Sequence, residues 1–343
     1  MSEANGTRRL RLRRSCLAVP GSNPKMIDKA RGLPVDQVFL DLEDACAPLA
    51  KPGARKIIVD ALNEGGWGER TRVVRVNDLT TEWTYRDVVE VVEGAGPNLD
   101  CVMLPKVQSA AQVQWLDLTL TQIEKTMGYE VGRIGIEAQI ENAQGLIGVD
   151  AIATASHRVE TIIFGPADFM ASINMRSLVV GEQPPGYDTG DAYHYILMRI
   201  LMAARASGLQ AIDGPYLQIK DTDGYRRLAR RSAALGFDGK WVVHPGQIDA
   251  ANEAYSPTQR DYDHAENILD AYEWFTSAAG GRRGAAMLGD EMIDEASRKM
   301  ALVLAGQGRA IGMRRGTTWS PPAVSTFTAG AGAAGAGKSH TAG

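Results

Sequence analysis

Two carboxylates and one arginine in this chain occupy positions from which they could act on a single substrate. Glu141 and Asp168 end two successive apolar segments, and Arg75 lies near the end of an earlier one. Carboxylates at the tips of neighbouring strands, about 4.8 Å apart, can together hold Mg²⁺, a hard cation that takes oxygen ligands and keeps several waters. The planar, permanently charged guanidinium of Arg75 suits a carboxylate or a developing oxyanion. These residue types therefore predict a metal-assisted site for an anionic substrate.

Each of these residues also has a purely structural explanation. The two carboxylates could share a proton or form an ion pair with Arg75, and Arg75 could form a salt bridge with Asp41 or Glu43. Both kinds of role are compatible in one side chain. Zinc is disfavoured, because the five histidines show no ligand spacing.

The elements that would position these residues alternate regularly along the chain. Short apolar, β-branched segments are predicted to be buried parallel strands, and segments with helical spacing lie between most of them. Eight strand–helix units in about 250 residues are typical of a (β/α)8 TIM barrel. The alternative, an open doubly wound sheet, is disfavoured because no Gly-x-Gly-x-x-Gly follows an early strand. The predicted strands are Cys16–Pro20, Gln37–Leu42, Arg72–Asn77, Cys101–Lys106, Ile134–Glu141, Thr161–Asp168, Leu209–Asp213 and Lys240–His244.

Polar residues gather where these predicted strands end. In a parallel barrel the carboxyl ends of the strands form the one face on which active sites are built. Polar residues also mark strand ends simply because loops begin there, but that explains one or two positions rather than six. The positions are Asp41 to Asp44, Asn77, Lys106, Glu141, Asp168 and His244-Pro245.

The chain is predicted to divide into four parts. Residues 1–14 carry five arginines and are expected to form a basic arm, either solvated or packed on a neighbouring subunit. Residues 15–256 form the barrel, and residues 257–316 form a small helical extension. Residues 317–343 are rich in Gly and Ala and are expected to be a disordered tail, since they cannot bury enough surface to offset the entropy of ordering.

The predicted extension contains two helices, Tyr262–Ser277 and Glu291–Ala305. A glycine-rich break at Gly280–Gly284 lies between them. We expect this break to act as a hinge that lets the last helix move as a lid.

The overall composition excludes several classes of protein. Hydrophobic residues make up 44% of the chain and charged residues 23%, which excludes bulk disorder. A net charge of −4 gives no basis for nucleic-acid binding. No apolar run is long enough to span a bilayer, and no apolar region follows the basic start as in a secretory signal. Three distant cysteines match no disulfide framework, so we expect a reducing, cytoplasmic setting with no membrane partner.

These residues together resemble the citrate lyase β-subunit-like CoA-ester lyases, which belong with the HpcH/HpaI aldolases. The resemblance runs from about Ser15 to Ala305 and is strongest to the malyl-CoA lyase branch. Each motif is short, but their order and their positions at strand ends make the set specific. The motifs are Leu40 to Ala45, Lys51 with Ala54-Arg55, Arg75 to Asn77, Leu104 to Lys106, Gln139 to Ala143, Phe164 to Phe169, Tyr193 to Tyr195, Ile212 to Pro215, Gly239-Lys240 with His244-Pro245, and Gly289 to Asp294.

The resemblance implies a TIM barrel with a C-terminal lid, assembled as a homotrimer or homohexamer. It implies cleavage of a 3-hydroxyacyl-CoA (L-malyl-CoA, β-methylmalyl-CoA or citramalyl-CoA) to an α-keto acid such as glyoxylate plus acetyl-CoA or propionyl-CoA. Mg²⁺, with Mn²⁺ as a substitute, is the implied cofactor. Asn142 follows the glutamate where many relatives carry a hydroxyl residue, which leaves the substrate choice open.

The resemblance also implies roles for individual residues. Arg75 would stabilise the thioester enolate, and Asp294 would be the acid/base, contributed across a subunit interface. An aspartate at this place can equally be a helix cap. The full set is Glu141 and Asp168 for the metal, Arg75 and Asp294 for catalysis, Arg75, Asn77, Ala167 and Asp168 for the substrate, and Lys25 and Pro245 for CoA.

Two alternatives to a lyase remain. A malyl-CoA thioesterase could use the same metal site with water as the nucleophile. A non-catalytic barrel could serve as a binding subunit. The presence of Arg75, Glu141, Asp168 and Asp294 together argues against the second alternative.

Overall fold

The computed structural model describes residues 11–321, which form two compact units. The first ends at Ser256 and the second begins at Pro257, and each is described by itself. The expectations for residues 1–10 and for the tail from residue 322 onward lie outside the described residues.

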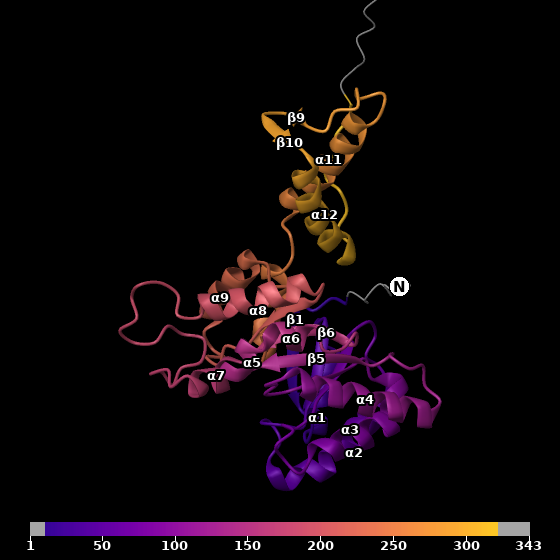
Figure 1. Ribbon diagram of the computed structural model, residues 1–343, viewed down its shortest axis with the longest axis vertical. Coiled ribbons are helices and arrows are strands. Elements are labelled where there is room, and N and C mark those ends of the chain that lie inside the picture. Colours follow the sequence, from indigo (N-terminus) through magenta and orange to yellow (C-terminus); the bar gives the residue numbers. More distant parts are fainter. Residues whose placement is uncertain (1–10, 322–343) are drawn as a thin grey trace, which may run out of the picture. The chain divides into compact units, whose positions relative to one another are not determined.

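The first unit is built on a closed barrel of eight parallel strands, each hydrogen-bonded to the next and β8 to β1. Figure 1 labels β1, β5 and β6 among these strands. The predicted TIM barrel is thereby confirmed, and each predicted strand is present. The strands are β1 (Ser15–Pro20), β2 (Gln37–Asp41), β3 (Thr71–Arg75), β4 (Cys101–Leu104), β5 (Gly135–Ile140), β6 (Val159–Phe164), β7 (Gln210–Asp213) and β8 (Gly239–Val242).

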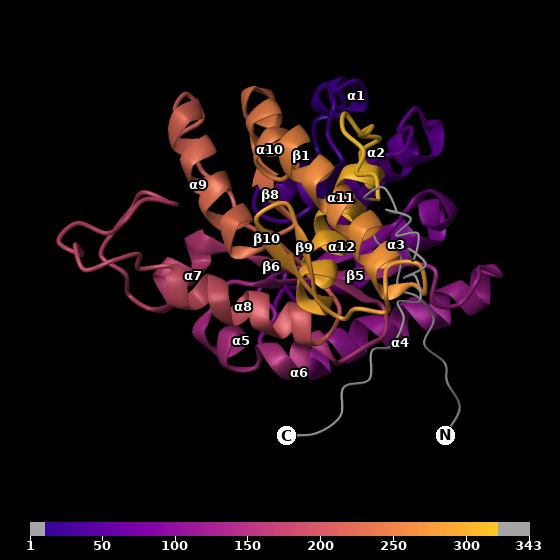
Figure 2. The same cartoon turned by 90° about the horizontal axis from the view of Figure 1, so that it is seen from above.

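Helices surround this barrel (Figure 2). Most of the buried apolar side chains lie between the strands and this helical layer. The helices are α1 (Pro24–Arg31), α2 (Lys51–Glu64), α3 (Thr84–Ala95), α4 (Ala110–Met127), α5 (Ala143–Ile147), α6 (Val149–Ala153), α7 (Pro166–Ser172), α8 (His194–Ala206), α9 (Thr222–Leu235) and α10 (Ile248–Ala254), with single 3₁₀ turns at Pro48–Ala50, Gly96–Asn98 and Pro245–Gln247.

Alternation along each strand separates this outer core from a smaller inner one. In β2, for example, Phe39 belongs to the inner cluster and Leu40 to the outer one, because successive side chains of a strand point to opposite faces. The same alternation brings Asp41, Arg75 and Glu141 to the inside of the barrel mouth. The inner cluster consists of Cys16, Phe39, Val73, Cys101, Met103, Ile163, Ile212 and Trp241.

The opposite end of the barrel is closed by Arg13, which differs from the expectation of a solvated arm. Arg13 is buried, and its Nε donates to Gln37 Oε1 at 2.9 Å and to Glu137 Oε1 at 3.0 Å. Arg14 pairs with Asp36 at 2.8 Å. A carboxylate inside a barrel needs a charged partner, and Glu137 obtains it from this N-terminal segment. Residues 11–14 are therefore part of the barrel rather than of an arm.

The strands end earlier than predicted, which changes the setting of Asp168. The predicted sixth strand extends to Asp168, but β6 ends at Phe164 and Pro166 begins helix α7. Pro166 favours this start, because its fixed φ suits the first helical turn. Asp168 therefore lies in the first turn of a short helix and not at a strand tip.

The second unit contains a hairpin that the sequence reading missed. It consists of α11 (Gln259–Thr276), the antiparallel strands β9 (Ala286–Leu288) and β10 (Glu291–Ile293), and α12 (Glu295–Ala310). The predicted last helix is thus wrong at its start, where residues 291–293 form β10. The two helices pack through a shared apolar core that includes Phe275 and Ile293.

The break at Gly280–Gly284 is a packed turn. A Cβ at Gly280 would collide with the backbone carbonyl of Trp274, and Arg283 N donates to Phe275 O at 2.8 Å. Since α11 and α12 also share a core, the packing favours movement of both helices together over movement of α12 about this turn. Within residues 11–321, no helix is long and apolar enough to cross a bilayer.

Candidate active site

Arg75 is held by two carboxylates at the mouth of the barrel. Its Nε and one terminal nitrogen donate to the two oxygens of Asp41 at 2.7 and 2.6 Å, and its other terminal nitrogen lies 2.9 Å from Glu43 Oε2. The guanidinium carbon lies 5.2 Å from the ring centroid of Trp241 and 5.9 Å from that of Phe39. These contacts engage at most three of the five N–H groups, so Arg75 can still bind an oxyanion.

The strand register explains why Asp41 and Arg75 meet. They are the last residues of β2 and β3 and are paired partners across the two strands. Burial opposes the charge on Asp41, but the guanidinium of Arg75 and the backbone N–H groups of Glu43 and Ala45 hold the Asp41 pKa below its ordinary value. Burial also opposes the charge on Arg75, and Asp41 and Glu43 outweigh it and raise the Arg75 pKa. Both groups are therefore charged at neutral pH.

Lys51 fixes the loop that follows β2. Its Nζ donates to the carbonyl oxygens of Leu42 and Glu43 at 2.7 Å each and to Asn77 Oδ1 at 2.6 Å. Asn77 in turn donates from Nδ2 to Asp87 Oδ2 at 2.6 Å. Both ends of the Asn77 amide are thus engaged within the protein, so this predicted substrate-binding residue has a clear part in positioning Glu43.

Glu141 is buried immediately after β5. Its Oε1 accepts a hydrogen bond from Lys106 N at 2.9 Å. A Cβ at Gly165, just after β6, would lie 2.6 Å from Glu141 Oε2, so only glycine at position 165 leaves room for this carboxylate. Burial raises the pKa of Glu141 to about 8; Arg75 acts against this shift, and the nearby charges of Glu43 and Asp168 add to it. An added cation would favour the ionised form.

Asp168 is more exposed than Glu141, at 42% of its side-chain surface. It lies in the first turn of α7, as does the exposed Ala167. Its Oδ1 lies 3.8 Å from Lys106 Nζ. The structure thus brings Arg75, Glu141 and Asp168 to one end of the barrel, as the positions of their strands predict.

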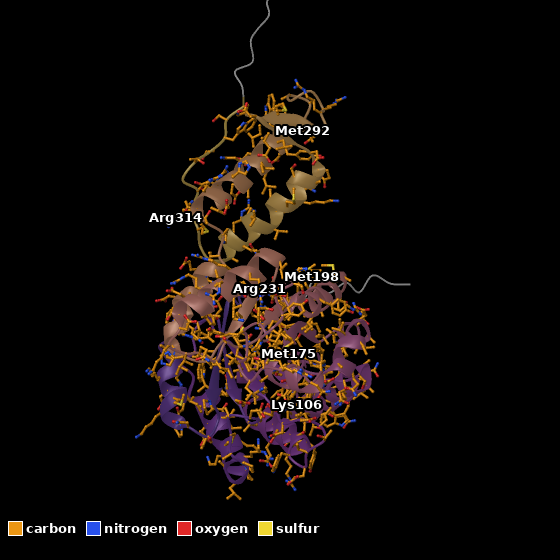
Figure 3. All side chains as sticks on the ribbon, turned by 90° about the vertical axis from the view of Figure 1, so that its left-hand side faces the viewer. Lys106, Met175, Met198, Arg231, Met292 and Arg314 are labelled. Carbon is orange, nitrogen blue, oxygen red and sulfur yellow. The ribbon has the colours of Figure 1, made fainter. Side chains whose placement is uncertain are left out.

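Lys106 is a member of this cluster to which the sequence reading assigned no role. Its Nζ forms a short contact with Glu43 Oε1 and lies 3.5 Å from Asp44 Oδ1 (Figure 3 labels the residue). Burial acts against its charge, but Glu43 and the other carboxylates raise the pKa of Lys106. The sequence does contain a feature that could have indicated this role, since Lys106 is a basic residue at one strand end and most of the other strand ends carry acidic residues.

The oxygen donors of this cluster fit a magnesium ion whose other ligands are water molecules and substrate oxygens. In the described part of the chain, no three His, Cys, Asp or Glu side chains are grouped so that they could hold a metal by themselves. Glu141 and Asp168 offer oxygen only, which is the donor that Mg²⁺ prefers, and Mg²⁺ often takes just one or two carboxylates. The ammonium of Lys106 beside Asp168 shows that a cation is favoured here.

The two predicted CoA-binding residues follow neighbouring strands. Lys25 is exposed in the first turn of α1, after β1, and Pro245 begins the 3₁₀ turn after β8. Because β1 and β8 are hydrogen-bonded neighbours, both residues lie on the face of the barrel that carries Arg75.

Asp294 belongs to the second unit, where it caps α12. Its Oδ1 accepts from Ser297 N at 3.0 Å, and Ser297 Oγ accepts from Asp294 N at 3.3 Å. Ser297 N and Ser297 Oγ both donate to Asp294 Oδ1, and these hydrogen bonds, with that from Ser297 N having the larger effect, lower the pKa of Asp294. The helix-cap role is therefore present, and the acid/base role stays a prediction.

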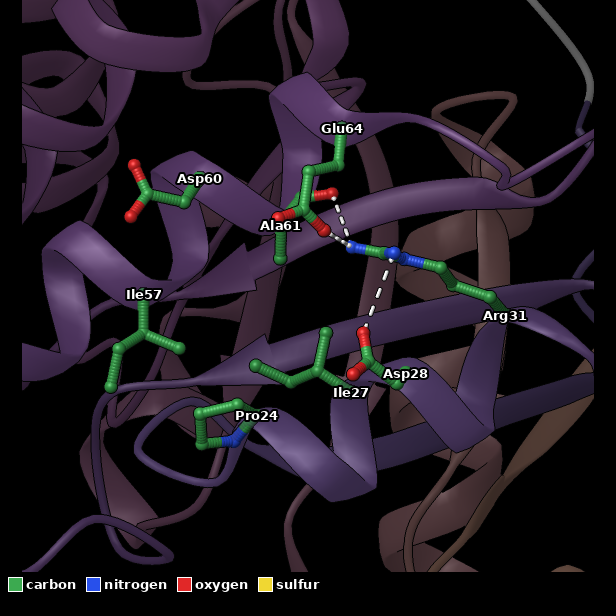
Figure 4. A pocket seen from close by; sticks show the side chains of 8 residues that line it. All are labelled: Pro24, Ile27, Asp28, Arg31, Ile57, Asp60, Ala61 and Glu64. Atoms are coloured by element: carbon green, nitrogen blue, oxygen red, sulfur yellow. Dashed lines mark hydrogen bonds and ion pairs between the residues drawn. The ribbon is translucent and has the colours of Figure 1, made fainter.

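Two cavities lie apart from the predicted site residues. One, of about 200 Å³, lies between α1 and α2 (Figure 4). Its Arg31 is already paired with Glu64 at 2.7 Å and with Asp28 at 3.4 Å. The other, of about 510 Å³, contains the ion pair of Arg231 and Asp191 at 2.8 Å. Neither is lined by a residue assigned above to metal, substrate or CoA.

Comparisons with known proteins agree with this barrel fold. The L-malyl-CoA/beta-methylmalyl-CoA lyase of Cereibacter sphaeroides is 38% identical over 300 residues, which cover 85% of this chain and 93% of that protein. The citrate lyase subunit beta of Escherichia coli is 35% identical over 287 residues, covering 84% and 90%.

A solved structure of the protein CitE from Mycobacterium tuberculosis, in complex with magnesium, acetoacetate and coenzyme A, is also similar. It matches with a TM-score of 0.65 and 30% identity over 85% of this chain and 97% of that one. The model of the family described as HpcH/HpaI aldolase/citrate lyase matches residues 14–245. The chain therefore belongs to the HpcH/HpaI aldolase/citrate lyase family.

Proposed function

We propose that this protein is a Mg²⁺-dependent carbon–carbon lyase that cleaves a 3-hydroxyacyl-CoA to an α-keto acid and a shorter acyl-CoA. The observation that carries the proposal is the guanidinium of Arg75, held by Asp41 and Glu43 at the barrel end that also carries Glu141 and Asp168. The names of the relatives favour L-malyl-CoA and β-methylmalyl-CoA as substrates. Citramalyl-CoA is a third candidate, from the family resemblance alone.

Each step of this reaction has a residue suited to it. Glu141 and Asp168 would hold the metal, which when bound supplies the Lewis acidity that polarises the carbonyl of the keto acid. Arg75, fixed on one edge by Asp41, offers its remaining N–H groups to the thioester enolate oxygen. Asp294, whose pKa is lowered and which is therefore ionised before the substrate binds, would accept the hydroxyl proton of the 3-hydroxyacyl-CoA and return it to the enolate carbon, or remove a proton from the acyl-CoA in the reverse direction.

The binding of the two halves of the substrate follows from the same face. Ala167 and Asp168 would contact the carboxylate end of the keto acid, while Lys25 and Pro245 would contact CoA. The magnesium, acetoacetate and coenzyme A in the Mycobacterium tuberculosis CitE structure support a ligand set of this kind. We further propose a homotrimer or homohexamer in the cytoplasm, with Asp294 supplied by a neighbouring subunit.

A thioesterase reaction at the same metal site is the second candidate. The lyase converts malyl-CoA to acetyl-CoA, which has no free thiol, whereas the thioesterase releases free CoA, so a thiol assay reports only the second reaction. The test is product analysis with malyl-, β-methylmalyl- and citramalyl-CoA, with Mg²⁺ and then with EDTA. Glyoxylate together with acetyl-CoA identifies the lyase, free CoA with malate identifies the thioesterase, and no turnover of any substrate identifies a binding subunit.

A further inference from the structure

The ammonium of Lys106 lies beside Asp168, one of the two proposed metal ligands, and beside Glu43 and Asp44. Its Nζ contacts Glu43 and lies 3.5 Å from Asp44 Oδ1 and 3.8 Å from Asp168 Oδ1. Among residues 11–321, Lys106 is the only cationic side chain within 4.0 Å of Asp168. The neighbouring Arg75 is paired with Asp41 and Glu43 instead.

The backbone of Lys106 also contacts this site. Its N–H donates to Glu141 Oε1 at 2.9 Å, so one residue contacts both proposed ligands, Glu141 through the main chain and Asp168 through the side chain. Lys106 has φ +52°, a conformation that non-glycine residues adopt only occasionally. Lys106 lies two residues beyond the end of β4, so this conformation sets the direction of the chain as it leaves the strand.

Carboxylates gathered at one point repel each other unless a cation neutralises them. A lysine ammonium and a divalent metal are alternative means of doing this. Since a ligand oxygen of Asp168 that faces an ammonium is less available to a metal, the two cations compete for the same carboxylate.

We propose that the ammonium of Lys106 is a built-in counter-ion that the metal displaces from Asp168. Without the metal, the ammonium of Lys106 neutralises Glu43 and Asp168. Once the metal is bound, the ammonium keeps its ion pairs with Glu43 and Asp44 only. The inference rests on the proposed metal ligands Glu141 and Asp168. It makes Lys106 a positioning residue that weakens metal binding to the free enzyme.

Binding of Mn²⁺ to the full-length protein, followed by its electron paramagnetic resonance and by calorimetry, tests this directly. Lys106→Met removes the ammonium but keeps the N–H to Glu141, so the Kd for Mn²⁺ should fall about tenfold, a typical effect of one nearby charge. Lys106→Arg keeps the charge and should leave the Kd within about threefold. Lys56→Met, which removes an exposed ion pair with Asp60, is the matched control and should have no effect.

Thermal unfolding gives a second measurement that does not depend on turnover. In EDTA, Lys106→Met should melt below the wild-type protein, because its carboxylates are no longer neutralised. Saturating Mg²⁺ should then raise its Tm by more than it raises that of the wild type.

The outcomes separate this inference from the proposed metal site. If Asp168→Asn abolishes Mn²⁺ binding but Lys106→Met binds no more tightly than the wild type, the metal site stands and the counter-ion inference is wrong. If Asp168→Asn binds Mn²⁺ normally, or neither the wild type nor Lys106→Met binds it, the proposed ligands themselves are wrong. If Lys106→Met binds Mn²⁺ more tightly than the wild type, and adding Asp168→Asn to it abolishes this gain, the metal site and the counter-ion inference are both supported.

Discussion

Asp41 and Arg75 end neighbouring strands in register and form an ion pair through two hydrogen bonds, of 2.7 and 2.6 Å. Both side chains are buried, so the pair sets the direction of the guanidinium as well as its charge. The orientation of the proposed enolate-binding group is therefore determined by the barrel strands themselves.

Asp41→Asn tests this orientation. Removal of one partner from an isolated buried ion pair costs ~3–5 kcal/mol, and the loss here should be smaller because Glu43 remains 2.9 Å from Arg75. We expect kcat to fall about 10²-fold, as for a misplaced oxyanion donor, with a matching loss in urea unfolding. Asp60→Asn, which breaks an exposed pair on α2, is the control and should change neither quantity. An unchanged kcat in Asp41→Asn would show that Arg75 does not need this partner.

The same pair predicts an acid dependence of stability. The pKa of Asp41 in the folded protein lies below its ordinary value of 3.8, so the unfolded state binds the proton more readily. The contribution of Asp41 is therefore complete above about pH 4 and is lost as the pH falls through the lowered pKa. The difference in unfolding free energy between wild type and Asp41→Asn should shrink along this acid limb. A difference that stays constant down to acid unfolding would contradict the linkage.

Arg75→Lys keeps the charge but loses the planar fork. One ammonium cannot bind both oxygens of Asp41 in plane and also face the substrate, so we expect kcat/KM to fall by about 10²-fold or more. Circular dichroism should show an intact barrel. Wild-type kinetics in this variant would leave only the structural salt bridge as the role of Arg75.

Glu141→Ala and Asp168→Ala should each reduce Mg²⁺-dependent cleavage to background while the barrel stays folded. Each variant loses one of two anionic ligands, and no other Lewis acid is available to the reaction. Steady-state rates over a Mg²⁺ titration measure the effect. Near-normal turnover of either variant in excess chelator would refute the metal assignment.

Asp294→Asn separates the two roles of that residue. Asparagine caps helices about as well as aspartate, so α12 should persist while turnover stops and substrate binding is retained. Ser297→Ala removes the hydroxyl from the reciprocal cap but keeps the backbone N–H that Asp294 accepts, so it should lower the stability slightly with little change in kcat. Mixed oligomers of Asp294→Asn and Glu141→Ala should regain activity if Asp294 acts in a neighbouring subunit. Subunit exchange shown by mass without recovered activity would contradict donation between subunits.

The strands could be predicted because their signal is local. Most of them contain a short apolar, β-branched run, as Cys101–Leu104 and Val159–Phe164 illustrate, and eight such strands along the chain specify a barrel. The side chains at the barrel mouth followed from the strand ends. The hairpin of β9 and β10 had a local signal as well, the Gly289-Asp290 turn, which was outweighed by the helical pattern around it.

The remaining features depend on contacts between distant residues or on backbone conformation. The burial of Arg13 depends on Glu137, 124 positions later in the chain. The position of the Lys106 side chain depends on the positive φ of this residue, and the residue types around it do not predict that conformation. Asp168 was predicted to end a strand but lies in a helix, because Pro166 begins α7. The apolar run up to Phe164 made a longer strand look more favourable than a helix start.

The missing side chain at Gly165 has a consequence for how this enzyme can diverge. Any Cβ at this position would meet the carboxylate of Glu141, 2.6 Å from Oε2, so each substitution would move a proposed metal ligand. Substitution of Gly165 is therefore disfavoured for as long as Glu141 keeps this position. A change in substrate preference is therefore more readily reached by substitutions at positions whose side chains leave Glu141 in place.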